Sequence, residues 1–159
     1  MRTYPVRMAI LITSSLVCLS AVPASAAEQF VDTKDGKPLN IKPDTEQSKK
    51  FMATGQNPYI GDQAAIAEGK KLYQLYSCAQ CHGAQAQGQT AGGLTGAKLN
   101  HAKSATDKGM FEIIWAGTNA GMSGKGKGVM DPTDPKNGMS PDEVLKLIAW
   151  IRSQGQGAK

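Results

Sequence analysis

Three residues within a span of five positions form the most informative pattern in this sequence of 159 residues. Cys78 and Cys81 are separated by two residues, and His82 follows directly. At this spacing both sulfurs can reach the two vinyl groups on one porphyrin edge, and the adjacent imidazole can bind the iron from one side. C-x-x-C-H is the attachment signature of haem c. The pattern therefore predicts one covalent haem c, with Cys78 and Cys81 as thioethers and His82 as the proximal axial ligand.

The first 26 residues have the composition of a secretory signal peptide. Arg2 and Arg7 give a positive start, residues 8–22 are an apolar run, and Ala24-Ser25-Ala26 is a small-residue cleavage site. The apolar run is shorter than the roughly 20 residues that a membrane-spanning helix needs. We expect cleavage near Ala26 and a periplasmic mature protein without a membrane span.

Cleavage would change both the cysteine count and the charge. Cys18 would leave with the signal peptide, so only Cys78 and Cys81 would remain. Two exported cysteines form a disulfide by default, but the histidine that follows them favours haem attachment. Arg2 and Arg7 would leave too, so the net charge would fall from +5 to +3. This small charge gives no support for nucleic-acid binding.

The mature chain is long enough for one small domain. We expect an N-terminal extension over 27–61 and a haem-binding domain over 62–159. The extension is polar and rich in turn residues, with a short helix near 45–53. It is interpreted as irregular chain wrapped over the domain, and flexible disorder is the alternative.

The domain is predicted to be all-α, because no segment alternates as a strand would. Helices are expected over about 62–76 and 107–116, and a third after the N-cap Ser140. Ser140 and Glu143 form a capping box around Pro141. A glycine inside a helix costs roughly 1 kcal/mol, so Gly69 predicts a second helix packed closely against the first. The apolar stripe of the last helix is Val144, Leu145, Ile148, Ala149 and Ile151.

Two glycine-rich loops, 83–108 and 117–138, are too long for ordinary connections and suit a fold wrapped around a bulky group. The second contains two candidates for the distal iron ligand, Met122 and Met130. Val129 and Pro132 would restrain Met130, whereas Met122 is followed in the sequence by the flexible segment Ser-Gly-Lys-Gly-Lys-Gly. Met130 is therefore favoured as the distal axial ligand, with Met122 as the alternative. A methionine would occupy the second axial position of the haem iron, and this favours electron transfer over catalysis.

Other candidates in the two loops and their surroundings are weaker. Met110 and Met139 are expected to pack in the core, the latter next to the cap of the last helix. His101 lies in a polar loop and is expected at the surface or near the haem propionates. Lys125 and Lys127 could guide an acidic partner, or could simply be solvated.

Several of these motifs occur in the order found in class I cytochromes c. Gly69-x-x-x-Tyr73, the Cys78–His82 motif, a glycine-rich ligand loop and a final Leu147-Ile148-Ala149-Trp150-Ile151 helix resemble that family over about 62–153. The resemblance implies three to four helices around one haem c. It also implies that Trp150 crosses the helix of Gly69 and Tyr73.

Two further segments are similar to the cytochrome c-L group. They are Lys49-Lys50-Phe51-x-x-Thr54-Gly55-x-Asn57-x-Tyr59 and Thr106-Asp107-Lys108-Gly109-Met110-Phe111-x-x-Ile114. That group consists of periplasmic electron acceptors of PQQ-dependent methanol dehydrogenases, and similar small cytochromes serve quinoprotein ethanol dehydrogenases. The histidine-to-methionine spacing of the group selects Met122, whereas its Met-x-Pro pattern and the distance to the last helix select Met130. Gly92 replaces the proline usual in that group.

The resemblance implies an electron-transfer protein and not an enzyme. Its donor would be a PQQ-dependent alcohol dehydrogenase, for ethanol or methanol, and its acceptor another cytochrome or a terminal oxidase. The chain ends just after the last helix, which favours an ethanol or general alcohol dehydrogenase. The alternatives are a general periplasmic shuttle with another donor, or an open-iron haem enzyme such as a peroxidase, for which the sequence supplies no distal His/Arg pair.

Overall fold

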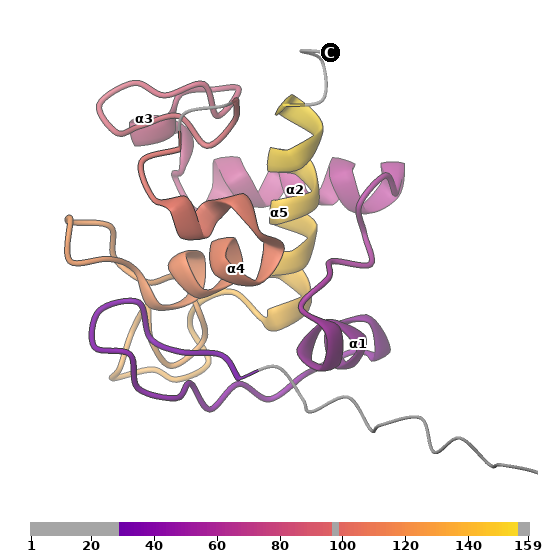
Figure 1. The fold of residues 1–159 in the computed structure, drawn as a ribbon, viewed down its shortest axis with the longest axis vertical. Helices are drawn as coiled ribbons and strands as arrows, with labels where there is room; N and C mark the ends of the chain where they lie inside the picture. The colour runs from indigo at the N-terminus through magenta and orange to yellow at the C-terminus, as the bar shows by residue number, and fades with distance from the viewer. Residues whose placement is uncertain (1–28, 97–98, 156–159) are drawn as a thin grey trace, which may run out of the picture.

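The computed structural model of the chain describes residues 29–96 and 99–155 (Figure 1). The expected signal peptide, 1–26, lies outside the described residues. The described ranges contain helices and isolated bridges but no β-strand, which confirms the all-α prediction. No helix in this part of the chain has the length and apolar character needed to cross a bilayer. The helices are α1 (Glu46–Thr54), α2 (Gln63–Leu75), α3 (Ala79–His82), α4 (Asp107–Ala116) and α5 (Pro141–Gly155), with a 3₁₀ turn at Ala102–Ala105.

The centre of the fold is the crossing of α2 and α5 (Figure 1). A Cβ atom on Gly69 would collide with the carbonyl group of Lys146 and would lie 2.9 Å from the Cβ of Trp150. One turn further along α2, the rings of Tyr73 and Trp150 are in contact, with their centroids 4.3 Å apart. The close packing predicted from Gly69 and Trp150 is confirmed, because the two backbones can approach this far only where α2 has no side chain.

The ends of the helices are set by local hydrogen bonds that the sequence predicted. Asp62 caps α2 by accepting hydrogen bonds from the backbone N–H groups of Ala64 and Ala65, at 2.9 and 3.0 Å. In α5, the Ser140 N–H donates to Glu143 Oε2 at 2.7 Å, and the Glu143 N–H donates to Ser140 Oγ at 3.3 Å. The predicted capping box is therefore present, and every residue of the predicted apolar stripe of α5 is buried.

The N-terminal extension packs on the helical domain at several points along its described length. Thr45 caps α1, and the helix ends at Gly55, which has a φ of 68°. Phe30 and Phe51 of the extension form an aromatic cluster with Phe111 of α4, with ring centroids 5.0 to 5.5 Å apart. The structure therefore has the wrapped arrangement, not the disordered one.

A buried carboxylate joins the extension to α4. Glu112 is fully buried and accepts a hydrogen bond from the backbone N–H of Val31 at 2.9 Å. It also forms ion pairs with Lys103 and Lys108, at 2.6 and 2.9 Å. Burial alone would raise the pKa of Glu112, but the hydrogen bonds from the two lysines and from Val31 hold its pKa below the usual value.

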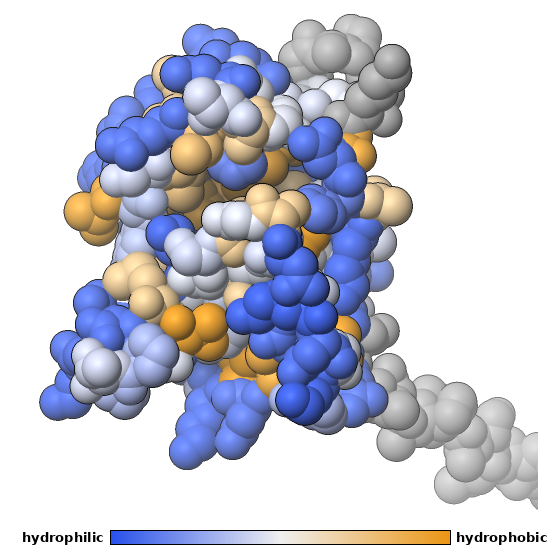
Figure 2. Space-filling model, turned by 90° about the vertical axis from the view of Figure 1, so that its left-hand side faces the viewer, coloured by the Kyte–Doolittle hydropathy of each residue, from blue (hydrophilic) through white to orange (hydrophobic). Residues whose placement is uncertain are grey.

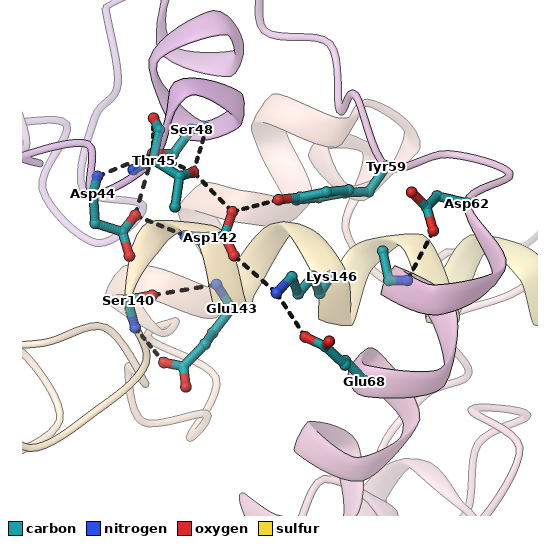
Figure 3. Close-up of polar contacts among 11 residues, drawn as sticks. Asp44, Thr45, Ser48, Tyr59, Asp62, Glu68, Ser140, Asp142, Glu143 and Lys146 are labelled. Atoms are coloured by element: carbon teal, nitrogen blue, oxygen red, sulfur yellow. Dashed lines mark hydrogen bonds and ion pairs between the residues drawn. The ribbon is translucent and has the colours of Figure 1, made fainter.

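A second buried carboxylate, Asp142, joins the extension to α5 (Figure 3). It accepts hydrogen bonds from the hydroxyl groups of Thr45 and Tyr59, at 2.8 and 2.7 Å. It also forms an ion pair with Lys146 at 3.1 Å, and Lys146 forms a second ion pair with Glu68 of α2 at 2.6 Å. Burial opposes ionisation, but these three donors outweigh it, so the pKa of Asp142 lies below the usual value. Burial is the main reason that the pKa of Tyr59 rises to about 12.

Asp142→Ala should destabilise the holoprotein by about 2 kcal/mol at pH 7, because it leaves the half-buried hydroxyl donors of Thr45 and Tyr59 without their acceptor. Since folding lowers the pKa of Asp142, this contribution is complete above the carboxyl's unfolded pKa. The stabilisation by Asp142 should disappear as the pH falls through the lower pKa that this carboxyl has in the folded protein. Urea unfolding at pH 7 and pH 3 measures both effects. Glu46→Ala, which alters an exposed carboxylate of α1, serves as the control and should change stability by less than about 0.5 kcal/mol. Equal losses for the two variants at pH 7 would contradict the assignment.

Candidate functional site

The residues of the C-x-x-C-H motif lie on one helical turn, directly after the helix crossing. The backbone leaves α2 through Ser77, which has a φ of 59°, and the Cys78 N–H then donates to the carbonyl of Tyr73 at 3.0 Å. The His82 N–H donates to the carbonyl of Cys78 at 2.9 Å. Both thiols are free, with Cys78 half-buried and Cys81 exposed. The sulfurs and the imidazole are therefore held together on α3, as covalent attachment to one porphyrin edge requires.

The orientation of the His82 ring is set by a main-chain carbonyl. Nδ1 of His82 lies 2.8 Å from the carbonyl oxygen of Gly92, so Nδ1 carries the proton and donates it. This leaves Nε2 free to bind iron, the usual arrangement of a ligating histidine. The loop that carries Gly92 is itself tied to the motif, because the Ala91 N–H donates to the carbonyl of Cys81 at 2.9 Å.

A cavity opens beside the motif in two adjoining hollows, and the outer one has a volume of about 470 Å³. Both hollows are bounded by His82 and Met122, together with Leu94, Ser104 and Ile113. Figure 2 shows the hollowed face, with apolar side chains gathered in its upper part. The inner walls are mostly apolar and come from α2, α4 and α5: Tyr73, Met110, Ile114, Leu147 and Ile151.

The residues around this cavity fit a covalent haem. Cys78 borders the inner hollow and Cys81 the outer one, so the two sulfurs lie along its edge. The imidazole of His82 borders both. Apolar walls suit the porphyrin faces, and a pocket of this size is typical of cofactor sites. His101, expected at the surface or near the propionates, is exposed and borders the outer hollow.

The two candidate distal methionines lie in different places. Met122 borders both hollows of the cavity, together with His82. Met130 borders a separate hollow on the surface, beside Leu75 and Tyr76. The structure thus brings Met122 and His82 to one cavity and does not bring Met130 there. Met139 is buried in the core as expected, whereas the buried Met110 also contributes to the cavity wall.

The loop that carries Met122 is better fixed than its glycine content suggested. Gly117 and Ser123 form an antiparallel bridge, and the Thr118 N–H donates to the carbonyl of Met122 at 2.8 Å. Just after it, the Lys125 N–H donates to the carbonyl of Ile114 at 2.8 Å. The restraint on Met122 is supplied by main-chain groups, so side-chain types around it carried no signal of it.

Two buried groups around the motif are kept uncharged. Burial is the largest cause that raises the pKa of the Cys78 thiol and of the Tyr73 hydroxyl. The Tyr73 hydroxyl therefore stays a donor, and it holds the carbonyl of Gly83, the residue after His82, at 2.8 Å. Trp150 was expected to cross the helix that carries Tyr73, but the hydrogen bond from Tyr73 to the turn after His82 was not foreseen.

The fold and this cavity are those of a class I c-type cytochrome, and comparison with known proteins agrees. Residues 66–155 match the cytochrome c family. Cytochrome c-L of Methylorubrum extorquens is 34% identical over 153 residues, which cover 87% of this chain and 72% of the relative. The chain therefore belongs to the cytochrome c family and, within it, to the cytochrome c-L group. It is a monohaem electron carrier with one covalently bound haem c.

Solved structures give the same result. The crystal structure of cytochrome cL from Methylophaga aminisulfidivorans matches with a TM-score of 0.66 and 32% identity, covering 79% of each chain. Cytochrome cL from Hyphomicrobium denitrificans matches with a TM-score of 0.65 and 35% identity, covering 79% of this chain and 73% of that one. At these identities the likeness extends beyond the fold to the family.

Replacing the motif cysteines should remove the thioethers one at a time. Cys81→Ala should keep the haem attached through Cys78, and haem staining should persist after denaturing electrophoresis. The double variant Cys78→Ala/Cys81→Ala should lose the stain completely, because no covalent bond to the porphyrin remains. Cys18→Ala, the third cysteine of the sequence, is the matched control and should stain like the wild type. A double variant that still stains would disprove the attachment sites.

Proposed function

We propose that this protein is a periplasmic carrier that accepts single electrons from a PQQ-dependent alcohol dehydrogenase, for ethanol or methanol. It would pass them to another cytochrome or a terminal oxidase. The observation that carries the proposal is the similarity to cytochrome c-L, which extends over 87% of this chain. Residues 1–26 would direct export and be removed near Ala26, since their composition is that of a signal peptide.

In this proposal the haem is held by Cys78 and Cys81 through thioethers, by His82 as the proximal ligand, and by Met122 as the distal ligand. Met122 replaces Met130 as our preferred assignment, because Met122 borders the same cavity as His82 while Met130 borders another hollow. Bound haem supplies a one-electron couple, and a methionine ligand raises its potential relative to a second histidine.

The surrounding residues support the transfer of an electron without other chemistry. The His82–Gly92 hydrogen bond holds the imidazole in one tautomer and one orientation. Apolar side chains from α4 and α5 line much of the inner hollow and would pack against the porphyrin. Met122 would fill the distal position, so the protein would have no open site for substrates.

Separate replacement of the two methionines tests the distal ligand. Met122→Ala should abolish the methionine–iron charge-transfer band of the oxidised protein and lower its reduction potential. Met130→Ala is the matched control, since it removes the same side chain from the same loop, and it should retain the band. Loss of the band in Met130→Ala, with retention in Met122→Ala, would restore the preference for Met130.

The donor is tested by mixing oxidised holoprotein with a PQQ-dependent alcohol dehydrogenase and its alcohol. We expect the α-band of the reduced cytochrome to appear on alcohol addition, at a rate that depends on the concentrations of both proteins. A mixture without alcohol and one with an NAD-dependent dehydrogenase are the controls and should stay oxidised. If neither an ethanol-specific nor a methanol-specific PQQ enzyme reduced the haem, the proposed donor would be wrong. The assignment of the protein as an electron carrier would still stand.

A further inference from the structure

The N-terminal extension begins with a tight hairpin, residues 31–38, next to the loop that carries Met122. Val31 and Pro38 form an antiparallel bridge, and the Asp32 N–H donates to the carbonyl of Lys37 at 2.8 Å. Gly36, with a φ of 74°, closes the turn by donating its N–H to the carbonyl of Asp32 at 2.8 Å. The hairpin is thus stabilised by its own main-chain hydrogen bonds.

The base of the hairpin is anchored in the core of the domain. Phe30 is buried and packs against Phe51 and Phe111, with centroids 5.3 and 5.5 Å away. The backbone N–H of Val31 donates to the buried carboxylate of Glu112 at 2.9 Å. Because Glu112 belongs to α4, the hairpin is fixed to the same helix that leads into the Met122 loop.

The tip of the hairpin contacts that loop at two points. The hydroxyl of Thr33 donates a hydrogen bond to the carbonyl of Gly117, where α4 ends. The side-chain amide of Asn119 donates to the carbonyl of Lys34 at 3.2 Å. These contacts join residues more than 80 positions apart in the sequence.

Main-chain contacts hold the two ends of this loop together, and the hairpin contacts lie at one of these ends and on the exposed part between them. Gly117 forms one end of the bridge to Ser123, and a Cβ atom on Gly117 would collide with the backbone of residues 122–124. Between these ends, residues 119–121 are exposed. A displacement of Gly117 would therefore move Met122, whose carbonyl is bonded to the neighbouring Thr118 N–H.

We propose that the hairpin 31–38 is a positioning element for the distal ligand, and that Thr33 is its key positioning residue. It fixes Gly117 and so reduces the fraction of time in which the Met122 loop swings away from the cavity. The N-terminal extension would then tune how readily an outside ligand displaces the methionine. This inference rests on the proposed ligation by Met122.

The test measures imidazole binding to the oxidised holoprotein, because imidazole competes with the distal ligand for iron. Thr33→Val keeps the shape of the side chain and removes the hydroxyl. It should tighten the apparent imidazole affinity about fivefold, the equilibrium effect of one lost hydrogen bond. Asn119→Ala alters an exposed side chain and should shift the affinity in the same direction by a smaller factor. Lys37→Ala changes an exposed residue of the same hairpin whose side chain pairs with Asp35 of that hairpin, and should leave the affinity unchanged.

Three results distinguish this inference from the proposed function. If Met122→Ala loses the charge-transfer band and Thr33→Val binds imidazole as the wild type does, the positioning role is overturned and the ligand assignment stands. If Met122→Ala keeps the charge-transfer band, both the assignment of Met122 as the ligand and the positioning role of Thr33 are wrong. If Lys37→Ala shifts the affinity as much as Thr33→Val, general loosening of the hairpin replaces a specific role for Thr33.

Discussion

The close approach of α2 and α5 is the constraint from which the haem site follows. Gly69 lets the two helices touch at their backbones, and the Tyr73–Trp150 contact fixes the next turn. Since only three residues separate the end of α2 from the start of α3, this contact determines where Cys78 and His82 lie. The other partner, α5, supplies Leu147 and Ile151 to the opposite wall of the cavity. One glycine thus sets the distance between the motif and the surface against which the cofactor packs.

Around this crossing, buried carboxylates connect the N-terminal extension to the domain. Asp142 connects α1 and the Tyr59 segment with α5, and Glu112 connects the hairpin with α4. Each carboxylate is paired with lysine and receives further hydrogen bonds. A buried carboxylate is tolerated only when its lone pairs are satisfied in this way. The extension therefore specifies its own position through directional polar contacts, in addition to the aromatic cluster.

The helices that carry strong side-chain signals could be predicted from the sequence. The capping residues Asp62 and Ser140 and the apolar stripe of α5 located those helices to within one or two residues. The four-residue helix α3 was missed, because one turn is too short to show a period. The cysteines and His82 were recognisable, since haem attachment requires those residue types at that spacing.

On the distal side, the ligand that we propose from the structure differs from the one that the sequence favoured. Side-chain types favoured Met130, because Val129 and Pro132 stand beside it. The Met122 loop is held instead by main-chain hydrogen bonds and, in the positioning role that we propose, by Thr33 and Asn119, whose partners are backbone carbonyls. Backbone groups are the same in every residue, so their long-range pairing leaves no trace in a single sequence.

The hydrogen bond from His82 to the carbonyl of Gly92 bears on how this site can change over evolutionary time. The acceptor is a peptide group, which every amino acid possesses, so no point substitution at position 92 deletes it. A substitution at position 92 therefore keeps the acceptor of His82, and it would act on the imidazole by displacing the backbone or the Asn100 side chain, with which a Cβ atom on Gly92 would collide.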